Sequence, residues 1–272
     1  MALVSLREIL KDAHDMRYGV GLFNILDLQM LRGIMEAAEQ ERAPVIIGVA
    51  EVHLPILPFS WAAHLMTEAA KRLDVPVCLH FDHGMTTDAI LAAIHAGFTS
   101  VMYDGSALPF AENVQNTRAI VQEAKKYGVS VEAELGHVGM GDDMDDMLYT
   151  NAADVVSFVE QTGVDALAVA IGTAHGPYCR KPVLDIDRLQ EIRALSPVPL
   201  VLHGGSGLTD DDFRTVVQNG ISKVNICTDM CVAAAQAAKN QPVLEQIIPA
   251  QVAAVKETVV HKMQVFGSAG RA

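Results

Sequence analysis

Three histidines stand at the ends of short apolar runs and have the chemistry of metal ligands. His83, His175 and His203 are separated by 92 and 28 residues, so each belongs to a different run. If the ends of these runs meet, the three imidazoles would form a site with an open coordination position, which is typical of catalytic zinc. Another divalent cation would also fit, and each histidine taken alone could be an ordinary hydrogen-bonded one. The pattern favours a three-histidine zinc site.

Acidic residues accompany these histidines. Asp82 directly precedes His83, and because side chains alternate along a strand, we expect its carboxylate to turn away from the metal and to act as a general acid or base. A supporting or helix-capping role is the alternative for Asp82. Asp104 and Glu134 end two other runs and would form a carboxylate pair that holds a second metal position or orients His83. Glu132, two positions before Glu134, is expected to be structural.

Two segments that combine glycine with hydroxyl groups have the composition of a phosphate site. HGGSG (203–207) and NICTD (225–229) each run into a helical pattern. Backbone amides at the start of a helix bind anions without lysines, and glycine allows close backbone approach. Gly-Gly-Ser-Gly is also a common turn, so neither segment is specific alone. The predicted residues of this phosphate site are Gly176, Gly204, Ser206, Asn225 and Thr228, and Asn24 is a further predicted substrate-binding residue.

Eight apolar, β-branched runs alternate with helical stretches and would position these side chains. This alternation predicts an α/β fold, a (β/α)8 TIM barrel, in which catalytic groups project from the C-terminal ends of the strands. A doubly wound parallel sheet is the rival arrangement. We expect a single domain over 1–272, with an extra amphipathic helix after about residue 242. The strand candidates span 19–25, 44–50, 76–83, 100–105, 129–136, 166–176, 199–207 and 223–229.

Composition excludes several classes of function. The 272 residues include 20 Lys and Arg against 33 Asp and Glu, and the net charge of −13 would repel nucleic acids. No apolar run approaches the roughly 18 residues that a membrane span needs. Four cysteines without a CxxC pair, and an N-terminus without a signal-peptide core, predict a soluble cytoplasmic protein. Small phosphates remain possible ligands, because glycine-rich loops bind them through amides.

One connection is longer than an ordinary loop between a strand and a helix. It is the segment GHVGMGDDMDDMLYTN (136–151), which follows the fifth strand candidate and is rich in Gly and Asp. Two interpretations are open for it. It could be a lid that moves over a site at the strand ends, or a disordered surface insertion without a role in function.

Six longer motifs contain these candidate residues: HFDHG (80–84), MYDGS (102–106), VEAELG (131–136), AIGTAHG (170–176), LVLHGGSG (200–207) and VNICTD (224–229). In this order and spacing they resemble the zinc-dependent class II aldolases, most closely the ketose-bisphosphate branch of fructose- and tagatose-bisphosphate aldolases. The similarity covers nearly the whole chain. It implies a catalytic Zn²⁺ on His83, His175 and His203, with Asp82 as the proton-transfer residue.

The same resemblance implies a reaction and a set of ligands. Asp104 and Glu134 match the family's second metal position, which would hold a second divalent or a monovalent cation, and the glycine-rich segments match its dihydroxyacetone phosphate site. The implied reaction is reversible aldol cleavage of a sugar phosphate, in which Asp82 removes the C4 hydroxyl proton, the C3–C4 bond breaks and zinc stabilises the enediolate. A loop carboxylate then reprotonates the enediolate. A homodimer or homotetramer is the implied assembly.

Five positions bear on the substrate. The family loop usually reads Gly-Gly-x-Glu-Asp, whereas here Asp142 stands at the glutamate position and Asp143 follows it, so either could be the proton donor. Ala50 stands where Ser or Thr is common, and Cys227 where fructose-bisphosphate members often carry Asp. Arg271 matches a C-terminal arginine that can meet a distal phosphate, unless it is a frayed terminal residue.

These departures leave alternatives open for the activity. One is an aldolase for a ketose 1-phosphate that is longer or that yields a non-phosphorylated aldehyde, which the altered loop and Ala50 suggest. The other is a non-catalytic subunit that binds sugar phosphates. Asp82 beside a histidine metal site argues against the second, because a pure binding protein has no need of a proton-transfer group.

Overall fold

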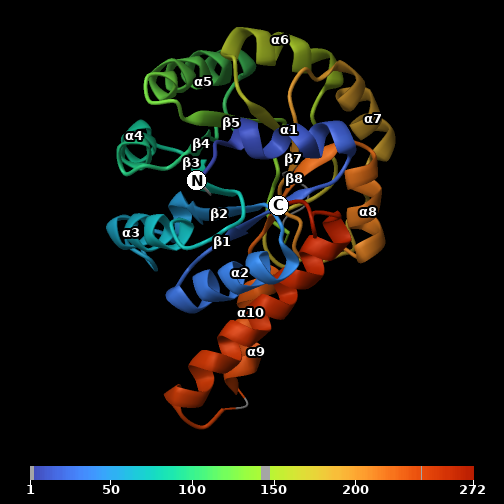
Figure 1. The fold of residues 1–272 in the computed structure, drawn as a ribbon. Helices are drawn as coiled ribbons and strands as arrows, with labels where there is room; N and C mark the ends of the chain where they lie inside the picture. The colour runs from blue at the N-terminus through green and yellow to red at the C-terminus, as the bar shows by residue number, and fades with distance from the viewer. Residues whose placement is uncertain (1–2, 142–147, 240) are drawn as a thin grey trace.

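The computed structural model describes residues 3–141, 148–239 and 241–272. In this part of the chain eight parallel strands form one closed barrel in the order β1 to β8, with helices around it (Figure 1). The predicted TIM barrel is confirmed, and the doubly wound sheet, which would leave two open edges, is excluded. The elements in chain order are α1 (Leu6–Met16), β1 (Val20–Asn24), α2 (Leu28–Glu41), β2 (Val45–Ala50), the 3-10 helix η1 (Glu51–His53), α3 (Phe59–Ala70), β3 (Val77–Gly84), α4 (Thr87–His95), β4 (Ser100–Tyr103), α5 (Phe110–Lys125), β5 (Ser130–Leu135), α6 (Ala152–Thr162), β6 (Ala166–Val169), α7 (Ile186–Leu195), β7 (Leu200–Leu202), α8 (Asp210–Gln218), β8 (Ile221–Ile226), α9 (Thr228–Lys239) and α10 (Leu244–Phe266).

Parallel pairing brings the C-terminal ends of all eight strands to one end of the barrel, which we call the mouth. Pairs such as Asn24↔Gly48 between β1 and β2 and Ala50↔Asp82 between β2 and β3 lie at this end. Strands that are four apart in a ring of eight, such as β3 and β7, lie on opposite sides of the barrel. The segments after β2 and β3 therefore face those after β6 and β7 across the mouth.

Three predicted strands end earlier than expected. The candidates 166–176 and 199–207 extended well beyond the observed ends of β6 and β7, and 223–229 is shifted relative to β8. Glycines in the left-handed region follow β6 and β7, with φ +115° at Gly172 and +66° at Gly204, and this conformation turns the backbone out of the sheet. The two candidate metal ligands of these segments consequently lie on loops. The other five strands agree with the prediction to within two residues at each end.

Helix α1, which the sequence analysis did not assign, closes the end of the barrel opposite the mouth (Figure 1). Its start is fixed by a capping box: Ser5 Oγ accepts a hydrogen bond from the Glu8 N–H, and the Glu8 carboxylate accepts one from the Ser5 N–H. Leu6 and Leu10 of its inner face are fully buried in a cluster with interior barrel side chains such as Leu22. The mouth is thus the open end of the barrel.

The extra C-terminal helix predicted after residue 242 is α10, which packs along α2 and α9 (Figure 1). The contact with α2 is close at Gly33. A Cβ atom added to Gly33 would lie 2.8 Å from Val255 Cβ and 2.9 Å from the Val252 carbonyl oxygen. The two helices therefore approach to a distance that only glycine permits at this position.

The substitution Gly33→Ala tests this close approach. We expect it to lower the free energy of unfolding by about 1–3 kcal/mol, because the added methyl group meets backbone that moves only if α10 shifts. Urea denaturation followed by circular dichroism measures the change. Arg32→Ala, on the exposed side of the same helix, is the matched control and should stay within about 0.5 kcal/mol of the wild type. Unchanged or increased stability of Gly33→Ala would contradict the packing argument.

Candidate active site

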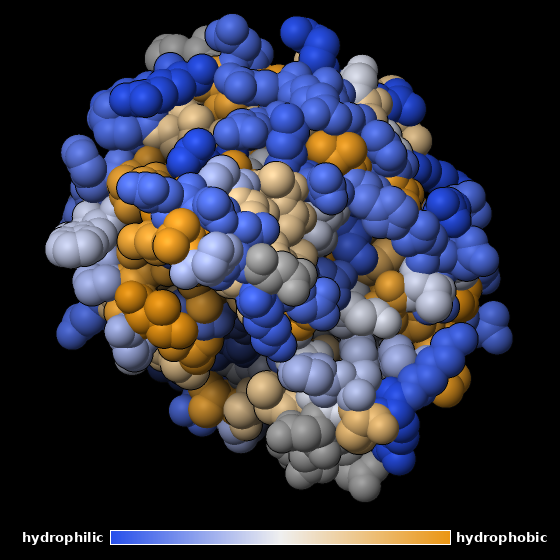
Figure 2. All heavy atoms as spheres, turned by 90° about the horizontal axis from the view of Figure 1, so that it is seen from below, coloured by the Kyte–Doolittle hydropathy of each residue, from blue (hydrophilic) through white to orange (hydrophobic). Residues whose placement is uncertain are grey.

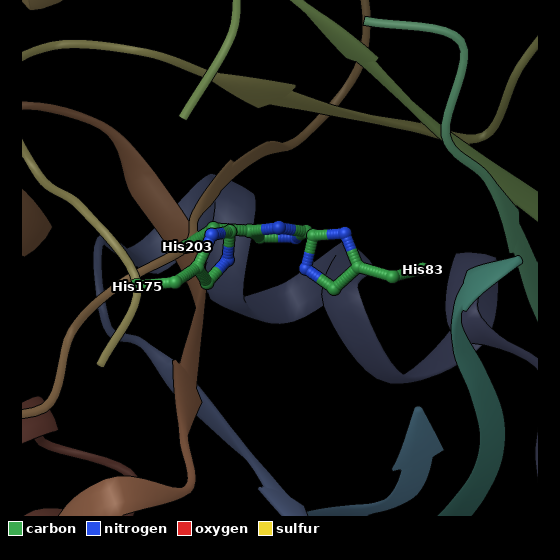
Figure 3. A group of neighbouring side chains, drawn as sticks. All are labelled: His83, His175 and His203. Carbon is green, nitrogen blue, oxygen red and sulfur yellow. The ribbon is translucent and has the colours of Figure 1, made fainter. Parts of the chain in front are cut away.

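Three histidine side chains meet at the mouth of the barrel (Figure 3). His83 comes from β3, His175 from the loop after β6 and His203 from the loop after β7. The ring centroid of His83 lies 4.7 Å from that of His175 and 4.5 Å from that of His203. One potential ligand nitrogen from each ring lies within 4.8 Å of the other two. The structure brings together the three residues that the sequence singled out as zinc ligands.

Two of these imidazoles have a buried nitrogen that no described group satisfies. His203 Nε2 donates to Glu132 Oε1 at 2.9 Å, which leaves the buried Nδ1 as the lone-pair nitrogen. His175 Nε2 is also buried without a partner among the described residues, and burial together with the neighbouring histidines lowers the pKa of His175 to about 3. Unsatisfied buried nitrogens are costly unless they bind something. Neutral imidazoles with free nitrogens fit a zinc ion.

The two carboxylates predicted to assist the metal lie beside these histidines. His83 Nδ1 donates to Asp104 Oδ2 at 2.8 Å, and the Ser106 hydroxyl donates to the other oxygen of Asp104 at 2.7 Å. Glu134 Oε2 lies 3.4 Å from His203 Nδ1 and has no hydrogen bond within the described part of the chain. Burial and the charge of Asp104 raise the pKa of Glu134 to about 8. His83, Asp104 and Glu134 can therefore share a cation, and Asp104 also orients the ring of His83.

Asp82 and His83 both line the mouth although they are consecutive residues of β3. Asp82 lies at the mouth, where a general acid or base is expected, and it is not in the group formed by the ligand nitrogens of His83, His175 and His203. His83 has φ +47°, and the register between β3 and β4 shifts at this point, so the strand alternation is interrupted. The left-handed conformation is unfavourable for a non-glycine residue, and such strain is concentrated at functional sites.

The Asp82 carboxylate is buried and held by amide donors from two neighbouring strands. Asn24 of β1 donates from Nδ2 to Asp82 Oδ2 at 2.7 Å, and Asn225 of β8 donates to Oδ1 at 3.1 Å. Burial alone would raise the pKa of Asp82, but nearby positive groups, His83 and Lys223 among them, hold this pKa well below its usual value. The carboxylate is therefore ionised at neutral pH and can accept a proton.

A buried network beneath Asp82 was missed by the sequence analysis. Lys223 is fully buried, with Nζ 2.9 Å from Glu132 Oε2, and it donates to Asn225 Oδ1 at 2.8 Å. Burial would raise the pKa of Glu132, but Lys223 and the hydrogen bond from a histidine lower it to about 2. His80, also fully buried, has Nε2 3.6 Å from Asp82 Oδ1. The presence of Lys223 in an apolar strand run was the sequence signal that could have indicated a buried charge. The structural role expected for Glu132 agrees with its pairing to this lysine.

The predicted phosphate residues gather on the side of β7 and β8. Ser206 Oγ accepts hydrogen bonds from the N–H groups of Cys227 and Asp229, both at 3.2 Å, so the loop after β7 is joined to the start of α9. This helix begins at Thr228, and the first N–H groups of a helix have no acceptor within it. One cavity of about 520 Å³ is lined by the predicted substrate-binding residues Asn24, Gly176, Gly204, Ser206, Asn225 and Thr228.

Arg271 does not line this cavity. Its guanidinium carbon lies 5.1 Å from the ring centroid of Tyr18, which precedes β1 and so marks the end of the barrel opposite the mouth. The Gly270 N–H donates to the Glu41 carbonyl at 2.8 Å and fixes the tail at the end of α2. The prediction that Arg271 meets a distal phosphate is therefore not supported within one chain, because α10 returns along α2 toward the closed end.

The loop after β5 is described only in part. Asp142 and Asp143 belong to 142–147, which lies outside the described residues, so their role as proton donors stays a prediction. Before that segment, the Gly141 N–H donates to the His175 carbonyl at 2.6 Å, and the His175 N–H donates to the Gly139 carbonyl at 2.8 Å. The first part of the loop thus pairs with the segment that carries a candidate zinc ligand.

Comparison with known proteins gives matches over nearly the whole chain. The family model described as fructose-bisphosphate aldolase class-II matches residues 4–271. The chain belongs to the class II fructose-bisphosphate aldolase family. This aldolase is 39% identical over 286 residues to a fructose-bisphosphate aldolase of Staphylococcus aureus, with all of both chains covered. It has the same identity and coverage with a probable fructose-bisphosphate aldolase of Bacillus subtilis.

Solved structures of aldolases resemble this one over nearly the whole chain. The YdjI aldolase from Escherichia coli K12 is 37% identical and superposes with a TM-score of 0.89 over 99% of each chain. A putative fructose-1,6-biphosphate aldolase from Coccidioides immitis is 26% identical, with a TM-score of 0.91 over 98% of this chain and 97% of the other. The family resemblance inferred from the motifs is confirmed, and the protein is an enzyme of the aldolase class of lyases.

The substitution Asp104→Asn tests the orienting contact. We expect it to weaken zinc binding by roughly 10–100-fold, because the neutral amide holds the His83 Nδ1–H less strongly than the carboxylate does. Competition with a chromogenic chelator measures the Kd for zinc. Asp88→Asn, an exposed position of α4, should leave the Kd unchanged. A wild-type Kd in Asp104→Asn would show that Asp104 does not orient the metal ligand.

Proposed function

We propose that this aldolase reversibly cleaves a ketose phosphate or bisphosphate into dihydroxyacetone phosphate and an aldehyde. The observation that carries the proposal is an ionised, amide-held Asp82 beside three histidines whose ligand nitrogens lie within 4.8 Å of one another, two of which have a buried nitrogen without a partner among the described residues. Membership of the family supports the reaction class. Zinc, when bound, supplies a Lewis acid that stabilises negative charge on the oxygens of the enediolate. The pair Asp104 and Glu134 offers a place for a second divalent or a monovalent cation.

Asp82 is the proton-transfer residue in this proposal. Its carboxylate accepts the proton of the C4 hydroxyl, the electrons of that O–H bond form the aldehyde carbonyl, and the C3–C4 bond breaks with its electrons left on C3. Asn24 and Asn225 donate to both oxygens of Asp82 and so hold the carboxylate in one orientation. Asp142 or Asp143 then donates a proton to C3. Condensation is the same sequence in reverse.

The phosphate of dihydroxyacetone phosphate is assigned to the loops after β7 and β8. Ser206 and Thr228 supply hydroxyl groups there, and Gly176 and Gly204 allow the backbone to approach closely. Thr228 begins α9 and lines the cavity, so the positive end of the helix dipole favours an anion there. Amide dipoles of this kind can bind a small phosphate in a chain whose net charge is −13.

We further propose that the chain acts as a single domain, in the cytoplasm, as a homodimer or homotetramer. Large apolar side chains are exposed after η1 and in α3, including Ile56 and Trp61, and Trp61 is 67% exposed. Figure 2 shows hydrophobic residues gathered on the left of an otherwise mostly hydrophilic face, the side on which Figure 1 draws α3. Exposed apolar patches often mark subunit interfaces. Among the described helices none has the length and apolar character to cross a membrane.

Removal of the metal tests the proposed function. We expect dialysis against EDTA to abolish release of dihydroxyacetone phosphate, because the chelator removes the zinc that the buried nitrogens of His175 and His203 would coordinate. Added zinc should restore the activity. A coupled assay with glycerol 3-phosphate dehydrogenase measures the product. Full activity in the presence of the chelator would exclude the metal-dependent reaction.

The substitution Asp82→Ala separates proton transfer from metal binding. We expect kcat to fall by roughly 10²–10⁴-fold, because no other group replaces the carboxylate at the C4 hydroxyl. The zinc content, measured by mass spectrometry, should stay that of the wild type. Asp88→Ala is the control and should keep normal kcat. A zinc-loaded Asp82→Ala enzyme with wild-type turnover would remove Asp82 from the mechanism.

A further inference from the structure

Four further residues that line the cavity are Ala50, Val52, His53 and Met85, and we call this group the aldehyde rim. Ala50 ends β2, Val52 and His53 follow it in η1, and Met85 follows β3, which lies opposite β7 in the ring of strands. With the substrate phosphate at the loops after β7 and β8, and with Asp82 at the C4 hydroxyl, the carbons beyond C4 extend toward this rim. The half of the substrate that becomes the aldehyde therefore meets these four side chains.

The described residues of this chain place no positive charge at the aldehyde rim for a second phosphate. None of the described residues that line the cavity is Lys or Arg, and Arg271 lies at the closed end of the barrel. A carboxylate also lies beside the rim, since Glu51 Oε2 accepts a hydrogen bond from the Met85 N–H at 2.7 Å. A phosphate on the far end of the substrate would meet repulsion here.

His53 is the polar side chain of this rim. It ends η1, which the Glu51 carboxylate ties to the segment after β3 through the N–H and hydroxyl of Thr86. His53 Nδ1 is buried and has no hydrogen-bond partner in the described residues. Burial lowers the pKa of His53, so its ring is neutral at pH 7 and offers one donor and one acceptor. A hydroxyl group, which both donates and accepts, matches this ring, whereas a phosphate dianion only accepts.

We propose that His53 hydrogen-bonds a hydroxyl group on the aldehyde half of the substrate, and that the preferred substrates are ketose 1-phosphates whose far end carries hydroxyls and no second phosphate. The inference rests on the aldolase activity proposed above. His53 is a specificity residue here, because it meets carbons beyond C4 and not the bond that breaks. Val52 and Met85 contribute apolar surface for the carbon chain.

The experiment measures condensation of dihydroxyacetone phosphate with three aldehydes by the zinc-loaded enzyme. The aldehydes are glyceraldehyde, glyceraldehyde 3-phosphate and propanal, which has the same three carbons without the hydroxyls. We expect the wild type to have a higher kcat/KM for glyceraldehyde than for glyceraldehyde 3-phosphate. His53→Phe keeps a ring and removes its hydrogen bonds, so kcat/KM should fall roughly 10–100-fold for glyceraldehyde and stay within about twofold for propanal.

His64→Phe is the matched control, because His64 is an exposed histidine of α3, and it should behave as the wild type does with all three aldehydes. The zinc content of His53→Phe should equal that of the wild type. An equal loss for glyceraldehyde and propanal would show that His53 only supports the rim, and would overturn its role in specificity.

Two further results would contradict the inference in distinguishable ways. A wild-type preference for glyceraldehyde 3-phosphate would overturn the assignment of an uncharged far end, and loss of that preference in Arg180→Gln would identify the loop after β6 as the source of the missing charge. Failure of the zinc-loaded wild type to condense any of the three aldehydes would instead overturn the proposed function on which the inference rests.

Discussion

Buried negative charge at the mouth of the barrel is the constraint on which the rest of the site depends. Ionised carboxylates in a protein interior are costly unless each has a partner. Lys223 neutralises Glu132, and side-chain amides hold Asp82. Burial would lower the pKa of His83, but the charges of Asp82 and Asp104 raise this pKa to about 9. The histidine cluster is thus the place where positive charge is still favoured, and a divalent cation meets this demand. The carboxylates that share this space are Asp82, Asp104, Glu132 and Glu134.

The barrel separates the tasks of the site by position around the ring. Charge pairing occurs inside the barrel, beneath the histidines, whereas binding occurs on opposite sides of the mouth. On the β7 and β8 side, amides and hydroxyls suit a phosphate. On the side of β2 and β3, His53 and apolar neighbours suit an uncharged chain with hydroxyls. Because the chain carries so many acids, we expect the placement of the few hydrogen-bond donors, more than the net charge, to determine where the substrate phosphate binds.

Much of this arrangement followed from local pattern. Apolar runs alternating with helical stretches are sufficient to indicate a barrel, and parallel strands bring their C-terminal ends together whatever their exact lengths. That is why His83, His175 and His203 were predicted to converge even though two of them lie on loops. The residue types then restrict the chemistry, because imidazoles with an open position fit zinc and a nearby carboxylate fits proton transfer.

The sequence by itself therefore determined the barrel, the family and the candidate residues of the site, because these depend on periodicity and on residue types at strand ends. The tertiary structure alone decided which groups meet. Strand alternation could not anticipate the φ of +47° that turns His83, nor the partner of Lys223, 91 residues away in Glu132. The tertiary structure also placed Arg271 at the closed end of the barrel and His53 in the cavity. Contacts between residues far apart in the chain arise from packing, which local patterns do not encode.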